Sequence, residues 1–116
     1  MRVMTIVTVV ETPEFQRRAR NLMSEEERLA LVDFVARNPA TGVSLGGGVR
    51  KFRFARESSG KSGGYRVVHF FNPDDGKPIF LITVFAKNEK ANLTPTETQA
   101  VKLLGELLSQ TYRRTP

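Results

Sequence analysis

A change in the spacing of apolar residues near residue 40 constrains the fold of this chain more than any other feature. Before it, Ser24-Glu25-Glu26-Glu27 forms a capping box, and the apolar residues that follow recur at helical spacing. Asn38-Pro39 ends this helix, because proline disfavours the helical conformation of the residue before it. After it, Phe52 and Phe54 alternate with basic residues, which is the spacing of a strand. The chain is therefore predicted to contain helices and strands in successive runs.

Local signals predict the elements on either side of this change. Met4 to Val10 is rich in Val, Ile and Thr, as strands are, and Pro13-Glu14 opens a short helix before the capped one. Residues 42–48 form a glycine-rich stretch that we interpret as a loop. Residues 50–55 and 65–71 are predicted to be strands.

The last strand and the last helix have the clearest local patterns. Ile79 to Phe85 is a nearly continuous apolar run, which indicates a strand buried on both faces. Thr94-Pro95-Thr96-Glu97 is a second helix-start signal, and this helix is predicted to run to about Tyr112. Its apolar stripe, interpreted as a core contact, consists of Val101, Leu104, Leu107 and Leu108.

The predicted order of elements is β-α-α-β-β-β-α, which is typical of the α+β class. We expect one domain over residues 1–116, with a largely antiparallel twisted sheet and the helices packed on one face. The chain has no cysteine, and the apolar stretch from Val3 to Val10 is too short for a membrane helix and has no cleavage site. We therefore expect a cytoplasmic protein with no membrane partner.

Basic residues are concentrated in one stretch of the chain. The net charge of the chain is +6. The segment from Arg50 to Arg66 contributes +5 of this charge, because it contains six basic residues and one acidic residue, Glu57. A local cluster of this kind favours a polyanionic partner, although a solvated basic surface would have the same composition.

Three segments resemble the RelE and HigB toxins of the RelE/ParE superfamily in order and spacing. They are Gly47-Gly48-Val49-Arg50-Lys51-Phe52-Arg53-Phe54-Ala55, Gly60-Lys61-Ser62-Gly63-Gly64-Tyr65-Arg66-Val67-Val68, and Leu81-Ile82-Thr83-Val84-Phe85-Ala86-Lys87-Asn88-Glu89-Lys90. The resemblance implies a RelE-like fold and the toxin of a type II toxin–antitoxin system, neutralised by a cognate antitoxin. It further implies a ribosome-dependent endoribonuclease that cleaves mRNA in the acceptor site and inhibits translation.

The basic residues suit this chemistry. Cleavage of RNA without a metal can use the neighbouring 2′-hydroxyl as nucleophile, which requires a positioned phosphodiester, stabilisation of phosphoryl charge and proton transfer. Arg66 matches the arginine of the family's Gly-Tyr-Arg motif and is our candidate for charge stabilisation. Lys61 and Lys87 are candidate acids or bases, because lysine among other cations loses affinity for its proton.

A second set of residues is expected to bind RNA rather than to react. It consists of Arg50, Lys51, Arg53, Lys90 and Phe85. Relatives often carry tyrosine where this chain has Phe85, which can stack on a base but cannot transfer a proton. His69, the only histidine, is interpreted as a packing residue within a strand, and no metal-ligand spacing or cofactor motif is visible.

Two alternatives share the same sequence features. A non-catalytic nucleic-acid-binding module could use the basic sheet with Tyr65 and Phe85 as stacking platforms. A gyrase-inhibiting toxin of the ParE branch would have the same fold, but that branch tends to lack the residues matched by Arg66, Lys61 and Lys87.

Overall fold

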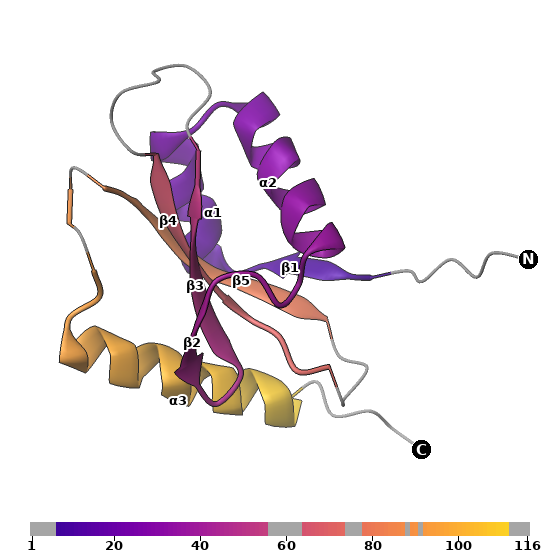
Figure 1. Cartoon of the computed structure of the whole chain (residues 1–116), viewed down its shortest axis with the longest axis vertical. Helices are drawn as coiled ribbons and strands as arrows, with labels where there is room; N and C mark the ends of the chain where they lie inside the picture. The colour runs from indigo at the N-terminus through magenta and orange to yellow at the C-terminus, as the bar shows by residue number, and fades with distance from the viewer. Residues whose placement is uncertain (1–6, 56–63, 74–77, 88, 91, 112–116) are drawn as a thin grey trace, which may run out of the picture.

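The computed structural model describes residues 7–55, 64–73, 78–87, 89–90 and 92–111, and it confirms the α+β class (Figure 1). Among these residues no helix is long and apolar enough to span a bilayer. The elements in chain order are β1 (Val9–Glu11), α1 (Pro13–Leu22), α2 (Glu25–Arg37), β2 (Val43–Gly46), β3 (Val49–Phe54), β4 (Tyr65–Phe70), β5 (Ile79–Ala86) and α3 (Pro95–Thr111).

The strands form one sheet in the order β1-β5-β4-β3-β2. The pairs β2–β3, β3–β4 and β4–β5 are antiparallel, and only β1 runs parallel to its neighbour β5. This parallel pair is possible because α1 and α2 and the three following strands intervene between β1 and β5. The prediction of a largely antiparallel sheet is confirmed.

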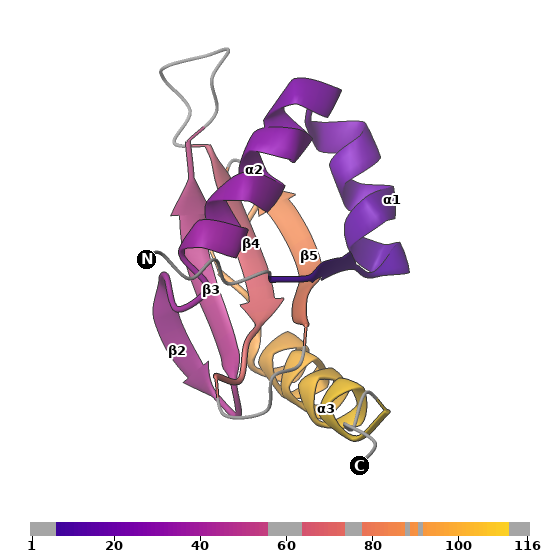
Figure 2. The same cartoon turned by 90° about the vertical axis from the view of Figure 1, so that its right-hand side faces the viewer.

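Helices cover both faces of the sheet, so the prediction that they pack on one face is wrong. One core layer joins α1 and α2, through Phe15 and Leu31, to Val67 and Leu81 on the sheet. The other layer lies under α3 and includes Val49, Val68, Phe70, Phe80 and Ile82 (Figure 2). The physical reason is the apolar run of β5, which is buried on both faces as predicted and therefore needs a cover on each.

Three capped starts define where the helices begin. In α2, the Ser24 hydroxyl accepts from the Glu27 amide at 3.1 Å, and the Glu27 carboxylate accepts from the Ser24 amide at 2.9 Å. Thr94 and Glu97 form the same reciprocal pair at α3, at 3.1 and 2.8 Å. Thr12 caps α1 and also donates to the carbonyl of Leu81, which ties α1 to the sheet. The predicted helix starts are confirmed.

The interpretation of residues 42–48 as a loop is wrong. The glycine-rich stretch 42–48 contains strand β2, in which Val43 pairs with Lys51, and glycines with positive φ follow it in the turn to β3. The sequence pattern missed this strand because its alternating residues are few and lie between glycines. Among the described residues the first strand begins at Val9, and the start of the predicted stretch at Met4 lies outside the described part of the chain.

The apolar stripe of α3 is only partly a core contact. Val101, Leu104 and Leu108 pack on the sheet, as predicted, whereas Leu107 is 59% exposed. Turns of 100° per residue place Leu107 and Leu103 on a side of the helix away from the sheet.

His69 is fully buried on the face covered by α2, which confirms its interpretation as a packing residue. Its ring meets Phe52 edge-on at 5.3 Å, and Nε2 lies 2.7 Å from the carbonyl oxygen of Pro39, so this nitrogen donates a hydrogen bond. Nδ1 is buried without a hydrogen-bond partner among the described residues. Burial lowers the pKa of His69.

We predict that acid destabilises the fold through His69. Because the folded-state pKa lies below the ordinary value of 6.5, the unfolded chain binds the proton more readily. The free energy of unfolding should be at its full value above pH 6.5 and fall towards about pH 5, above the range in which carboxylates titrate. Urea unfolding across this range measures the effect. His69→Phe should remove the slope, and a wild-type stability that is flat over this range would contradict the assignment.

Candidate nucleic-acid interface

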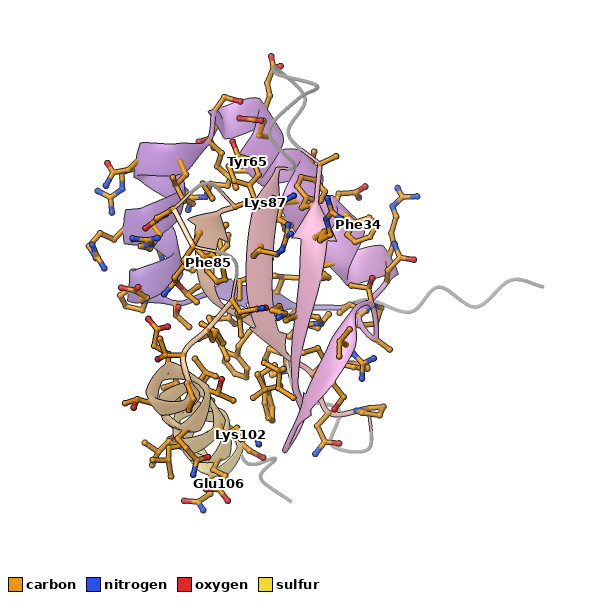
Figure 3. The ribbon with its side chains drawn as sticks, turned by 60° about the vertical axis from the view of Figure 1, so that its left-hand side comes forward. Phe34, Tyr65, Phe85, Lys87, Lys102 and Glu106 are labelled. Atoms are coloured by element: carbon orange, nitrogen blue, oxygen red, sulfur yellow. The ribbon has the colours of Figure 1, made fainter. Side chains whose placement is uncertain are left out.

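A basic surface lies on the same face of the sheet as α3, on the part that the helix does not cover. On β3, Lys51 and Arg53 alternate with residues of the α2 side and therefore share the α3 side with Val49. On β4, Arg66 shares this side with Val68. Figure 3 shows α3, with Lys102 and Glu106, at one end of the face and Phe85 and Lys87 towards the other. We call Lys51, Arg53 and Arg66 the basic face.

Strand register places the two arginines side by side. Arg53 is the cross-strand partner of Arg66, and Arg66 is in turn the partner of Phe85 on β5. Like charges directly opposite each other in an antiparallel pair destabilise it. The register therefore concentrates two positive charges at one position of the sheet, which favours binding of an anion there.

A hollow of about 390 Å³ lies beside these residues. It is bounded by basic and neutral residues, without a carboxylate among those described: Thr41, Gly42, Val43, Lys51, Phe52, Arg53 and Arg66. Its charge fits an anionic group such as a phosphate.

The segment between β5 and α3 is tied to the basic face from several sides. The Lys51 ammonium donates to the side-chain oxygen of Asn92. The Lys90 ammonium lies 5.0 Å from the centre of the Phe85 ring and 2.5 Å from a carboxylate oxygen of Glu97. These contacts hold the start of α3 against the open part of the face.

An arginine of α1 fixes the same segment from the other direction. The Nε of Arg18 donates to the carbonyl of Val84 at 3.1 Å, and its terminal nitrogen lies 2.5 Å from the Glu89 carboxylate. The hydrogen bond from Arg18 lowers the pKa of Glu89. The sequence analysis did not identify Arg18 or Asn92, since no local signal marks contacts across such separations.

The predicted site residues do not all lie together. Arg50 is on the α2 side, where its guanidinium donates to the carbonyls of Thr41 and Gly42 at 3.1 and 2.9 Å. Strand alternation explains this position, because neighbours in a strand point to opposite faces. Lys61 lies outside the described residues.

Lys87 lies towards the end of the sheet away from α3 (Figure 3), whereas Phe85 belongs to the core layer under α3. Lys87 is exposed, and its amide donates to the carbonyl of Gly64 at 3.2 Å, which places it beside the start of the strand that carries Arg66. Phe85 is only 1% exposed, because it packs in this core layer with Lys90 above its ring, so the ring is not open to a nucleobase in this conformation.

A family comparison covers nearly the whole chain. The model described as "RelE toxin of RelE / RelB toxin-antitoxin system" matches residues 7–115. The chain therefore belongs to the RelE toxin family, whose members are the toxins of toxin–antitoxin systems and pair with an antitoxin.

A solved structure agrees with this assignment at the level of the fold. The isolated E. coli RelE toxin superposes with a TM-score of 0.53 at 18% sequence identity, over 85% of this chain and 99% of that one. The two proteins share the RelE fold.

We predict that the substitution Arg53→Thr has two effects: it stabilises the fold and it weakens the binding of polyanions. Removing one of two opposed arginines and adding a residue with high strand propensity should raise the free energy of unfolding by about 0.2–1 kcal/mol. Urea unfolding at low salt measures this change. The log–log salt dependence of binding to a single-stranded RNA oligonucleotide should flatten by about 0.7.

The matched control is Arg37→Ala on α2, which removes one exposed positive charge from the other side of the sheet. It should leave the salt dependence unchanged. Equal flattening by both variants would mean that binding follows net charge and not the basic face.

Proposed function

We propose that this toxin is a ribosome-dependent endoribonuclease that cleaves mRNA and thereby inhibits translation in the cytoplasm. The observation that carries the proposal is the opposed pair Arg53 and Arg66 beside Lys51, above a hollow bounded by no described carboxylate. Membership of the RelE family supports the choice of mRNA in the ribosome as the substrate.

The basic face is suited to hold a single RNA strand by its phosphates. Lys51 and Arg53 lie two residues apart on β3, so their side chains follow one line along the same side of the strand. Arg66 stands across from Arg53 on the next strand. Contacts of this kind position a backbone without reading its sequence, and the codon is then selected by other contacts.

Arg66 is our candidate for stabilising the transition state. Attack of the 2′-hydroxyl on the adjacent phosphorus places additional negative charge on the phosphoryl oxygens. A guanidinium donates two parallel hydrogen bonds to such oxygens, and Arg66 occupies the middle of the row Arg53–Arg66–Phe85. A phosphate held between the two arginines therefore lies within reach of both.

Proton transfer is assigned to lysine. Arginine stays charged and cannot act as a base, and Phe85 lacks the hydroxyl of the tyrosine that relatives often carry. Lys87 is exposed, and its amide contacts Gly64, which is two residues before Arg66 in the sequence. Lys87 is therefore our candidate acid or base. Lys61 remains a candidate from sequence alone. Reaction through the 2′-hydroxyl requires no metal ion in this scheme.

We predict that Arg66→Ala separates binding from chemistry. Ribosome association should stay nearly intact, whereas the single-turnover rate of mRNA cleavage should fall on the order of 10²-fold or more. Arg66→Lys should recover little of the rate, because an ammonium keeps the charge but not the planar pair of donors. Cleavage at the wild-type rate by Arg66→Ala, with the ribosome bound, would favour a non-catalytic nucleic-acid-binding module.

We predict that Lys87→Arg is almost as damaging as Lys87→Ala if Lys87 transfers a proton. Arginine keeps the charge but does not titrate near neutral pH, so only a charge contact would be rescued. The loss should be about 10²- to 10⁴-fold in the single-turnover rate. Recovery of the rate by Lys87→Arg would reduce Lys87 to a phosphate contact.

A further inference from the structure

Glu97 makes two contacts that serve different purposes. One carboxylate oxygen accepts from the amide of Thr94 at 2.8 Å and completes the cap of α3. The other oxygen lies 2.5 Å from the ammonium of Lys90. The cap fixes the backbone of Glu97, since its own amide donates to the Thr94 hydroxyl at 3.1 Å. The carboxylate is therefore held in place opposite Lys90.

The cap does not require the negative charge of Glu97. Glutamine completes a capping box as well as glutamate does, because only a side-chain oxygen is needed to accept from the cap amide. The charge of Glu97 is therefore available for Lys90, and the hydrogen bond from Lys90 lowers the pKa of Glu97. At neutral pH the carboxylate is ionised and neutralises the ammonium.

Lys90 stands at the end of the row of residues that forms the proposed RNA site. Its ammonium lies over the ring of Phe85, and Phe85 is the cross-strand partner of Arg66. The side chains of Lys90 and Glu97 are 33% and 42% exposed, so solvent and a ligand can reach their contact. An ion pair this exposed contributes little to stability and is exchanged at small cost.

We infer that Lys90 is a phosphate subsite that Glu97 occupies in the unbound toxin. The inference rests on the proposed RNA-binding function and deepens it. A phosphate of the bound strand displaces the Glu97 carboxylate from Lys90. RNA that reaches only Lys51, Arg53 and Arg66 leaves the ion pair closed. Glu97 thus lowers the affinity of RNA that reaches Lys90, because such RNA must first displace the carboxylate.

The exchange has a signature in salt dependence. In the wild type, a phosphate that binds Lys90 releases counterions from RNA, but the freed carboxylate takes up a cation, and the two effects largely cancel. With Glu97→Gln nothing compensates for the released counterion. The log–log slope of RNA affinity against salt should then steepen by about 0.7.

The test measures binding of a single-stranded RNA oligonucleotide to the full chain across a salt series. At low salt, Glu97→Gln should bind about two- to fivefold more tightly than the wild type, which is the range expected for an exposed ion pair. Its thermal midpoint should not change, since glutamine keeps the cap. Lys90→Gln in the Glu97→Gln background should return the slope to the wild-type value.

Asp33→Asn is the matched control. Asp33 pairs with Arg37 at 3.1 Å on α2, so this change frees one arginine and alters net charge by the same amount on the other side of the sheet. It should leave the slope unchanged. If Glu97→Gln and Asp33→Asn tighten binding equally, or if Glu97→Gln has no effect, the subsite is refuted.

Lys90→Gln alone provides a second measurement that does not depend on the Glu97 variant. Loss of the subsite should weaken RNA binding with the fold intact, and wild-type affinity in a folded Lys90→Gln protein would overturn the inference. Failure of the proposed function is distinguishable, because Arg53→Thr would then also leave RNA binding unchanged. An effect of Arg53→Thr without one of Glu97→Gln rejects the subsite alone.

Discussion

Burial of β5 on both faces is the constraint on which the rest of the structure depends. Ile79, Leu81 and Val84 belong to the core under α1 and α2, whereas Phe80 and Phe85 belong to the core under α3. A strand with apolar side chains in both directions is stable only when both sides are covered. The two helical layers therefore lie on opposite faces, and α3 lies on the face that also carries the basic residues.

The length and position of α3 decide how the basic face is used. The helix covers the part of the face formed by Val49, Phe70 and Ile82. Arg53 and Arg66 are outside this core layer, and Arg53 is exposed. Apolar packing at one end thus supports a charged surface at the other, in which Arg53 and Arg66 lie directly opposite each other.

Much of the candidate site follows from sequence once the strand period is applied consistently. Alternation along β3 places Lys51 and Arg53 on one side of the sheet. The same alternation places Arg50 on the opposite side, although Arg50 is also among the residues predicted to bind RNA. The contacts that hold the site in place, by contrast, join residues that are far apart in the sequence. Arg18 meets Glu89 across 71 residues and Lys51 meets Asn92 across 41, and neither pair has a local signature.

The sequence by itself determined the features that depend on neighbours within a few residues. The capping boxes at Ser24 and Thr94 close over three residues, and the apolar run of β5 requires burial wherever that strand lies. The tertiary structure alone decided which face α3 covers, and that Glu97 neutralises Lys90 beside Phe85. The reason is that these contacts depend on sheet order and on the crossing of a helix over the sheet, which are set by packing of the whole chain and not by any local run of residues.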